Sequence, residues 1–364
     1  MKKSLIALAA LTAFAGAASA QSSVTLFGIV DAAYAHVSNS GGPSATGLTN
    51  SGLNSSRLGF RGIEDMGGGL RAIFWIEGQL SNDDGNAAGQ TWQRRSTVAL
   101  AGNFGEIRLG RDYTPSFWNL TVYDPFGTNG VGQYQGIGMI GAAGATAGVA
   151  ATTAGVNAVR ANNTIGYFLP GNLGGFNGQF QVAFGEQLSN AANKSQADYF
   201  GFRLGYGAGP LSVHYGYGNS KGASGASNIK YNNLGASFDM GVAKLMGQWS
   251  QEKAGTGAKV RGMLIGATVP MGQGELRASY ADFDVKGTAG SGASAINANP
   301  NDWSKMAIGY GYNLSKRTQM YATYARVSND GTQNKAVNNN GLTAGNAVPG
   351  KNSTGYELGI RHAF

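Results

Sequence analysis

The sequence predicts an all-β fold, a closed antiparallel barrel of about sixteen strands that crosses a membrane. Segments with apolar residues at every second position recur along the chain, and the links between them are alternately short and long. Only 13% of the residues are charged although 42% are hydrophobic, whereas soluble domains carry about 25% charged residues. Low charge suits a barrel, because its outer face must be uncharged where it lies in lipid.

The C-terminal segment supports this fold. In residues 354–364, Tyr356, Leu358, Ile360 and Phe364 fall on one face of a strand. A terminal phenylalanine after such a pattern resembles the recognition signal of bacterial outer-membrane barrels. We therefore predict that these four residues form the barrel-assembly signal.

The N-terminus predicts export. It opens with Met-Lys-Lys, continues as an apolar run to Ala17 and reaches the small-x-small sequence Ala-Ser-Ala at Ala20. This pattern is that of a secretory signal peptide and is too short to span a bilayer. We expect a signal peptide at residues 1–20 and a barrel domain at 21–364.

Composition narrows the functional classes. The chain has no cysteine, so an exported protein of this length must gain its stability without disulfides. The mature chain would have 25 basic and 19 acidic residues, a formal charge of +6. It has no long Lys/Arg run, so we expect no nucleic-acid partner.

The strands follow in order from the period of two, each bounded by turn residues. They are predicted at 24–37, 56–65, 70–80, 92–102, 105–111, 161–168, 176–187, 196–206, 211–218, 228–240, 242–251, 259–269, 274–285, 302–313, 318–327 and 354–364. Backbone groups cannot stay unpaired in lipid, so the first strand should pair with the last. A barrel of this strand number encloses water.

The links fall into two classes, as in outer-membrane barrels, whose periplasmic turns are short and whose outer loops are long. The short links are 66–69, 103–104, 208–210, 270–273 and 314–317. The long links are 38–55, 82–91, 114–160, 221–227, 286–301 and 328–351. An even strand number places both termini at the short-turn end.

Charged side chains mark the lumen face of the early strands. The apolar pairs Leu58 with Phe60 and Ile107 with Leu109 are predicted to face lipid. A charge facing lipid at the bilayer centre costs roughly 2–4 kcal/mol, which fixes the opposite faces as the lumen side. These carry Arg57, Arg61, Arg71, Glu77, Glu106 and Arg108. One of Arg94 and Arg95 also points inward, and the local pattern does not decide which.

The link at 113–160 is long enough to be functional. It follows Asp112, contains the sequence Tyr-Asp-Pro-Phe-Gly around Asp124 and ends at Arg160. We predict that it folds into the lumen and narrows the channel, with Asp124 facing the arginines across the water. The alternative is a surface loop that packs on neighbouring subunits or lipopolysaccharide.

Four stretches resemble the general porins of Gram-negative bacteria, above all those of the betaproteobacterial and neisserial kind. Residues 23–31 are similar to the first strand of the family, and 54–70 to its second strand, first turn and third-strand start. Residues 103–111 resemble the approach to the constriction loop, and 124–127 its acidic-Pro-Phe-Gly tip. The resemblance covers essentially the whole mature chain.

The resemblance implies a homotrimer of sixteen-stranded barrels in the outer membrane, each with its third loop inside the pore. It implies passive diffusion of small hydrophilic solutes and ions, often with anion preference, and contact with lipids, lipopolysaccharide and the barrel-assembly machinery. Arg57, Arg94 (or Arg95) and Arg160 match positions of pore arginines. The predicted constriction set is Arg57, Arg61, Arg71, Arg94, Arg95, Arg108, Arg160, Glu77, Asp112 and Asp124. Residues 136–159 depart from the family, being unusually rich in Gly, Ala and Thr.

Other chemistry is not indicated, and we expect no enzyme, no catalytic residue, no cofactor and no metal. Residues 136–141 match GxGxxG, but no βαβ unit surrounds them. The histidines His36, His214 and His362 lie on separate strands, which does not favour a metal site. Ser212 shares a face with His214, yet nothing marks a third catalytic partner.

Two alternatives to a general porin remain open. A substrate-specific channel would need a row of lumen-facing aromatic residues, whereas the aromatics here alternate outward. A non-conducting structural or adhesive barrel would need a small barrel of about eight strands filled by side chains. A soluble β-sandwich with the same alternation is a third possibility for the fold alone.

Overall fold

The structure is a computed structural model that describes residues 23–85, 91–136, 157–224, 227–255, 257–286, 302–339, 342 and 344–364. The predicted signal peptide, residues 1–20, lies outside the described residues. So do nearly all of the GxGxxG match at 136–141 and the central part of the link at 113–160.

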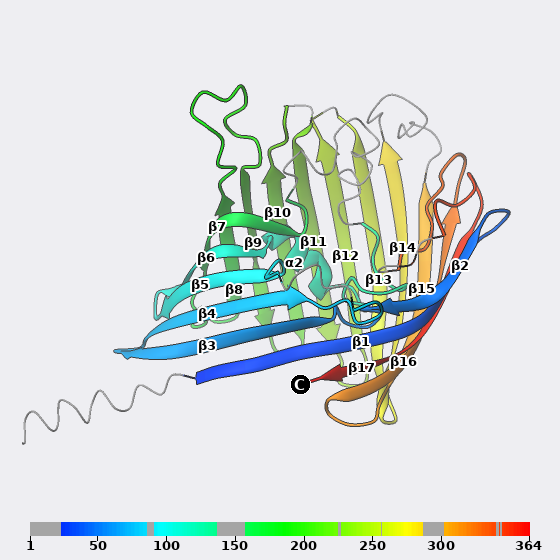
Figure 1. Ribbon diagram of the computed structural model, residues 1–364, viewed down its shortest axis with the longest axis horizontal. Helices are drawn as coiled ribbons and strands as arrows, with labels where there is room; N and C mark the ends of the chain where they lie inside the picture. The colour runs from blue at the N-terminus through cyan, green and yellow to red at the C-terminus, as the bar shows by residue number, and fades with distance from the viewer. Residues whose placement is uncertain are drawn as a thin grey trace, which may run out of the picture.

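The regular elements of the described chain are almost all strands (Figure 1). The strands are β1 (Ser23–Asn39), β2 (Ser44–Asn50), β3 (Arg57–Gly67), β4 (Leu70–Gln79), β5 (Arg95–Gly102), β6 (Gly105–Tyr113), β7 (Arg160–Phe168), β8 (Phe176–Ala183), β9 (Tyr199–Ala208), β10 (Leu211–Ser220), β11 (Ile229–Asp239), β12 (Lys244–Ala254), β13 (Lys259–Met271), β14 (Gly274–Lys286), β15 (Trp303–Asn313), β16 (Thr318–Asn329) and β17 (Ser353–Ala363). One described helix, α2 (Pro115–Val122), follows β6.

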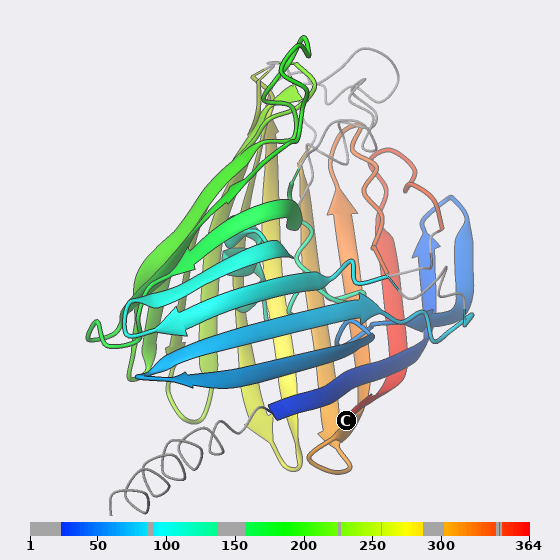
Figure 2. The same ribbon diagram turned by 60° about the vertical axis from the view of Figure 1, so that its left-hand side comes forward.

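The strands form a single closed antiparallel sheet, as predicted (Figure 2). Neighbours in the chain pair with each other from β3 to β17, and β1 closes the ring by pairing with β17 on one edge and with β3 on the other. Of the seventeen strands in the described residues, β2 lies outside the ring, which leaves sixteen. The sequence prediction missed β2, because its residues do not alternate between apolar and polar.

Alternation along each strand separates the two faces of the wall. In β16, Met320 and Tyr324 are exposed on the outer face, whereas Ala325 and Val327 are fully buried on the inner face. The same holds for Ile107 and Leu109 in β6, which are exposed as predicted. A one-residue slip would put charges into lipid, so this pattern fixes the register.

The two ends of the barrel differ in the length of their links. The turn between β3 and β4 is short and uses Gly67, Gly68 and Gly69, all with positive φ, a conformation that only glycine adopts without strain. At the other end most links are long, and the start of β1 and the C-terminus lie at the short-turn end (Figure 1). This division is the one predicted, with the long links facing outward from the cell.

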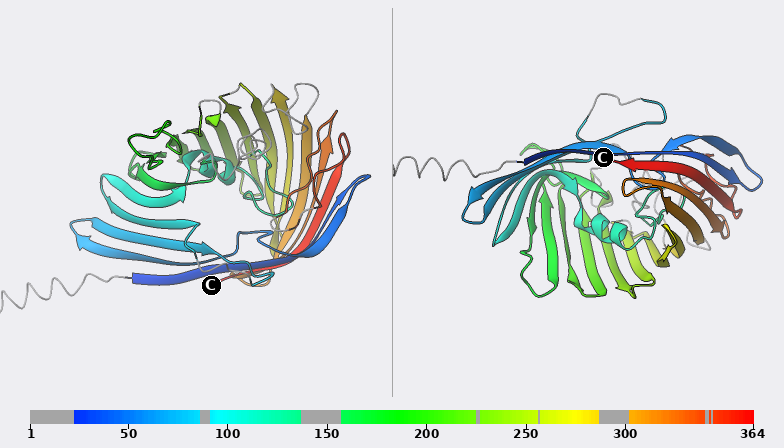
Figure 3. Two further views of the ribbon diagram at one scale, coloured as in Figure 1. Left: turned by 45° about the horizontal axis from the view of Figure 1, so that its top comes forward. Right: turned by 90° about the horizontal axis from the view of Figure 1, so that it is seen from below.

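The link between β6 and β7, here called the inner loop (residues 114–159), enters the ring. Helix α2 lies inside the barrel against β8, β9, β10 and β11 (Figure 3). The side chain of Thr114 caps the N-terminus of the helix by accepting a hydrogen bond from Phe117 N. Pro115 occupies the first turn, where its missing N–H costs no hydrogen bond. The inward path confirms the prediction.

The link between β16 and β17, here called the last loop (residues 330–352), also turns inward. Val337 of this loop is buried in a cluster that includes Val131 of the inner loop. Gln135 of the inner loop donates a hydrogen bond to the Ala336 carbonyl at 3.0 Å. No pattern in the sequence indicated this contact.

Among the described helices, none is long and apolar enough to cross a membrane.

Candidate functional site: the pore constriction

A polar cavity of about 1120 Å³ lies inside the barrel between the wall, α2 and the last loop. Four cations and two carboxylates line it: Arg57, Arg94, Arg160, Lys335, Asp83 and Asp84. The cations come from β3, the approach to β5, the start of β7 and the last loop. Elements distant in sequence therefore converge on one narrow, positively charged passage.

Three of these cations are held together as a unit, here called the arginine wall (Arg57, Arg94 and Arg160). Glu77 on β4 accepts hydrogen bonds from Arg94 Nε at 2.6 Å and from Arg57 Nη1 at 3.3 Å. Its other oxygen accepts from Trp75 Nε1 at 3.2 Å. Glu77 is buried, so one carboxylate fixes two guanidinium groups from behind.

Tyr113 joins the third arginine to this unit. Its hydroxyl accepts hydrogen bonds from Arg94 Nη2 at 2.9 Å and from Arg160 Nη2 at 2.6 Å. Arg160 also stacks on the Tyr113 ring, with 4.2 Å from its guanidinium carbon to the ring centroid. The three guanidinium groups thus have one carboxylate between them, which leaves excess positive charge beside the cavity.

A second cluster on the same wall is balanced in charge. Arg108 pairs with Asp112 at 2.6 Å and with Glu106 at 2.7 Å, and Arg95 lies 3.8 Å from Asp112. Arg95 also lies over the ring of Trp75 at 4.5 Å. Two arginines and two carboxylates compensate each other here, so this cluster adds little net field.

The structure answers the question that the sequence left open for Arg94 and Arg95. Arg95 begins β5 and shares its inward face with Thr97. Arg94 precedes the strand, where strict alternation does not apply, and it is buried against Glu77. Both side chains therefore lie on the inner side, not one of them.

Arg61 and Arg71 take a more remote position. Arg61 lies over the rings of Phe27 and Trp75, at 5.5 and 5.3 Å, and Arg71 is opposite Asp65 next to the short turn. Neither belongs to the lining of the described cavity. Their place in the constriction stays a prediction. Arg71 lies at the short-turn end, whereas Arg61 lies over Trp75, whose Nε1 also donates to Glu77.

Asp124 departs from its expected position. It is buried inside the inner loop instead of facing the arginines across water. Its carboxylate accepts hydrogen bonds from the backbone N–H groups of Phe126, Thr128 and Tyr134, at 3.0, 2.9 and 2.8 Å. Burial raises the pKa of Asp124, and these hydrogen bonds oppose the rise. Asp124 thus shapes the loop, which alternation along strands cannot predict.

The tip of the inner loop is fastened to the wall by charged side chains. Glu357 on β17 accepts a hydrogen bond from Val131 N at 3.3 Å, and Lys305 on β15 donates one to the Gln133 carbonyl at 2.7 Å. The other oxygen of Glu357 accepts from Asn339 Nδ2 of the last loop at 3.2 Å. One carboxylate therefore holds two loops inside the barrel.

Helix α2 is fastened to the opposite part of the wall by neutral groups. Asn119 Nδ2 donates to Asn233 Oδ1 at 2.6 Å and to the His214 carbonyl at 3.0 Å. The Tyr123 hydroxyl lies 2.6 Å from His214 Nδ1 and 2.8 Å from Ser212 Oγ. The Ser212–His214 pair, which the sequence did not favour as catalytic, is engaged in holding the loop.

Sequence reasoning missed several residues of the site. Lys335 lies in a long loop without periodicity, and burial lowers its pKa. Lys305 and Glu357 carry the expected inward phase of their strands, and that phase was the available signal. Tyr113 lies beyond a register shift between Gly110 and Asp112, and alternation from Ile107 and Leu109 would have placed it outward. Among the described residues no group of His, Asp and Glu is placed to hold a metal ion.

Two further features lie outside the lumen. The predicted assembly residues Tyr356, Leu358, Ile360 and Phe364 are all exposed on the outer face.

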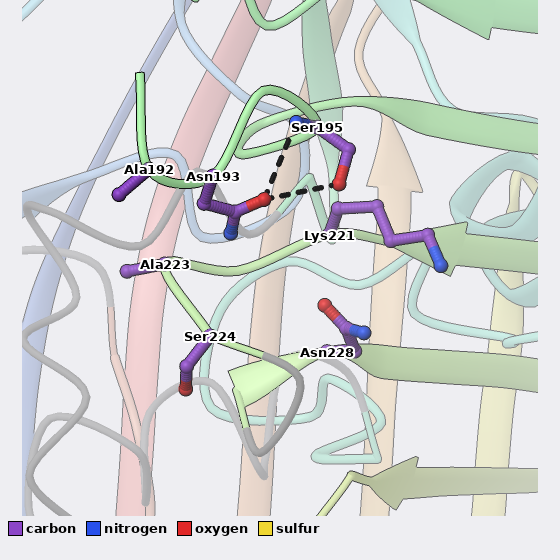
Figure 4. A pocket seen from close by; sticks show the side chains of 7 residues that line it. All are labelled: Ala192, Asn193, Ser195, Lys221, Ala223, Ser224 and Asn228. Carbon is purple, nitrogen blue, oxygen red and sulfur yellow. Dashed lines mark hydrogen bonds between the residues drawn. The ribbon is translucent and has the colours of Figure 1, made fainter. Parts of the chain in front are cut away.

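A hollow of about 360 Å³ lies among the long links (Figure 4). Two of its polar groups bond to each other, since Asn193 Oδ1 accepts from Ser195 Oγ at 3.1 Å, and Asn193 Nδ2 donates to the Gly222 carbonyl at 2.8 Å.

A closed sixteen-stranded ring with charged loops folded into a polar lumen defines a membrane channel, and comparison with known proteins gives its family. A family model described as Gram-negative porin matches residues 7–332. The chain belongs to this family and is a porin of the Gram-negative outer membrane.

Individual relatives agree with this family, two of them over all or nearly all of the chain. The chain is 44% identical to outer membrane porin protein 32 of Delftia acidovorans, covering all of both chains. It is similar to the solved structure of an anion-selective porin from Comamonas acidovorans, with 41% identity and a TM-score of 0.82 over 94% of this chain and 100% of that one. The major outer membrane protein P.IB of Neisseria meningitidis is 39% identical over 30% of this chain and 34% of its own length.

Proposed function

We propose that this porin prefers anions, and that the arginine wall sets the preference. The observation that supports this is the charge on the lining of the cavity, where four cations face two carboxylates. Including Glu77 behind the arginines still leaves the balance positive. The related porin from Comamonas acidovorans is described as anion-selective, which agrees with the same conclusion.

The mechanism is electrostatic and needs no binding step of high affinity. The guanidinium groups are permanently charged, and their geometry is fixed by Glu77 and Tyr113. In about 0.1 M salt their field extends about 10 Å, which reaches across a narrow passage. Asp124 is buried in its loop and offers no opposing charge to the water. Anions are therefore concentrated in the passage and cations are repelled.

The test is the reversal potential of Arg57→Ser in a planar bilayer under a salt gradient. One unit charge at about 5 Å in water is worth about 0.8 kcal/mol before screening, so the anion-to-cation permeability ratio should fall about twofold to fourfold. Arg326→Ser is the matched control, because Arg326 is exposed on β16 outside the lumen. An unchanged potential in Arg57→Ser would remove this residue from the constriction.

Other parts of the proposal rest on the family resemblance. The protein is exported with cleavage after Ala20, is recognised by the barrel-assembly machinery through its C-terminal strand and acts as a homotrimer. It passes small hydrophilic solutes without a specific substrate. Mass spectrometry of the mature N-terminus and cross-linking of intact membranes test the first and third of these statements. A monomer after cross-linking would contradict the trimer.

A further inference from the structure

Four lysines stand side by side on the outer face of the barrel. The register pairs Lys230 of β11 with Lys253 of β12, Lys253 with Lys259 of β13, and Lys259 with Lys286 of β14. All four lie at the end of the barrel that carries the long links. Strands are about 4.8 Å apart, so this lysine row (Lys230, Lys253, Lys259 and Lys286) is only about 14 Å wide.

The burial pattern shows that the row faces away from the lumen. The residues next to each lysine in its strand are buried on the inner side, as for Ile229 and Tyr231 around Lys230 and for Glu252 and Ala254 around Lys253. Lys286 keeps 63% of its side chain exposed. The ammonium groups therefore reach the surroundings of the barrel and take no part in the passage described above.

The next outward positions carry one more cation and one carboxylate. They hold Asn232, Gln251, Arg261 and Asp284 in the same order across the four strands. Gln251 Oε1 accepts a hydrogen bond from Arg261 Nε at 3.2 Å, and Asp284 lies 3.2 Å from Lys286 and 3.9 Å from Arg261. Five cations against one carboxylate leave this patch with a net charge of +4.

Below these two rows the outer face turns apolar. Leu234, Trp249 and Met263 are in register on β11, β12 and β13, and Leu234 and Met263 are exposed. Tryptophan is common where the hydrocarbon region meets the headgroups. The lysine row lies four residues further along each strand, roughly 13 Å along a strand, which places it at the headgroup level of the outer leaflet.

Like charges directly opposite each other destabilise a sheet, and three such pairs in succession need a counter-charge. Among the described residues, the carboxylates near this row gather at its β14 edge, where Asp282 lies close to Asp284, Asp302 and Asp330, and Asp284 contacts Lys286. An outside partner with several closely spaced anionic groups and an apolar anchor fits both rows. We propose that the lysine row binds the phosphate groups of lipopolysaccharide in the outer leaflet. This inference rests on the outer-membrane location and not on the anion preference of the pore.

The experiment compares lipid binding by the purified full-length porin and by the variant with Lys230, Lys253, Lys259 and Lys286 all changed to Gln. The probes are lipopolysaccharide, the same lipid with its phosphates removed, and inorganic phosphate. Each lysine near an anionic surface contributes about a fivefold factor in affinity. We expect the dissociation constant for intact lipopolysaccharide to rise at least about a hundredfold at low salt, and less at high salt.

Three controls make the result specific. A variant with all four lysines changed to Arg should bind as the natural chain does. A variant with Lys244, Lys316 and Arg317 changed to Gln removes cations at the short-turn end and should also bind normally. Single-channel conductance of the Gln variant should be unchanged, because the row is outside the lumen, so failure here is separate from failure of the proposed selectivity.

Each of the following results would overturn the proposal. Equal lipopolysaccharide affinity in the Gln variant, or equal affinity of the natural chain for the dephosphorylated lipid, would overturn the proposal. Binding of inorganic phosphate as tight as that of the lipid would assign the row to a free anion instead. A change in cross-linked trimer yield with unchanged lipid affinity would assign it to a neighbouring subunit.

Discussion

The two sides of the lumen use inward-facing polar groups differently. On β3 to β7, the arginine wall keeps guanidinium groups at the edge of a cavity, with Glu77 and Tyr113 behind them. On the remaining strands, inward groups such as His214, Lys305 and Glu357 bind loop backbone or loop side chains. The first side leaves its charge available to passing ions. The second side, here called the docking wall (inward-facing residues of β8 to β17, such as His214, Lys305 and Glu357), uses its side chains to hold the loops.

This difference shows that an inward charge is not by itself a selectivity residue. Glu357 faces the lumen as surely as Arg57 does, yet it is almost fully buried and accepts hydrogen bonds from two loops. The groups that line the cavity act on ions over the distance set by screening, and these include Arg94, although it is largely buried, but not Glu357. The predictions below separate the two roles.

The largest effect is expected from removing the part of the inner loop that narrows the lumen. Deletion of residues 123–155 removes the Tyr123 contact but leaves Asn119 of α2 bonded to Asn233. It should raise single-channel conductance at least about twofold, because the passage widens. Planar-bilayer recording measures this. Unchanged conductance with a correctly folded, heat-modifiable barrel would mean that the loop does not limit the flow of ions.

Weakening the docking wall should free the loop without changing selectivity directly. Glu357→Gln replaces a charged acceptor for Val131 N, and hydrogen bonds to charged groups are worth about 1.5–3 kcal/mol. The glutamine oxygen still accepts a neutral hydrogen bond, worth about 0.5–1.5 kcal/mol. We therefore expect the free energy of unfolding in urea to fall by about 1 kcal/mol for each of the bonds from Val131 and Asn339, and open-channel current noise to increase. A quiet channel in Glu357→Gln would contradict the docking role.

Neighbouring arginines should behave differently. Arg94→Ser removes a cation that lines the cavity while Glu77 keeps Arg57, so the anion-to-cation ratio should fall about twofold to fourfold. Arg95→Ser removes a cation that Asp112 already balances and should change that ratio less. Reversal potentials of the two variants give the comparison directly. Equal shifts would show that the charge-balanced cluster also faces the passage.

The smallest effect is expected where uncharged groups of the docking wall hold helix α2 and Tyr123. Tyr123→Phe deletes the hydroxyl that bonds His214 and Ser212, a loss of about 1 kcal/mol for neutral partners. Urea unfolding of the protein in detergent micelles should show a free energy of unfolding lower by that amount, and the reversal potential should be unchanged. A selectivity shift as large as that of Arg94→Ser would place Tyr123 in the ion path.

Local periodicity explains why the barrel was predictable and the loops were not. A strand in lipid must alternate, so the inward phase of Arg57, Glu77 and Arg108 could be inferred from Leu58, Phe74 and Ile107. Loop structure depends instead on contacts that no period encodes. Asp124 bonds its own loop, Lys335 reaches the cavity from an irregular segment, and Arg94 turns inward because it precedes its strand.

Some of the missed structure carried a readable signal. Thr114 followed by Pro115 is a helix start, with a capping hydroxyl and a proline in the first turn, and it predicts α2. Strand β2 had none, because its small polar residues would suit a loop equally well.

The zero-current potential of the purified porin under a tenfold salt gradient tests the central claim most directly. An arginine wall that is not compensated by carboxylates in the passage predicts a potential of anion-selective sign, which shrinks as salt is raised because the wall is screened. A potential of cation-selective sign would mean that Asp83, Asp84 or other carboxylates control the passage, and would contradict the account.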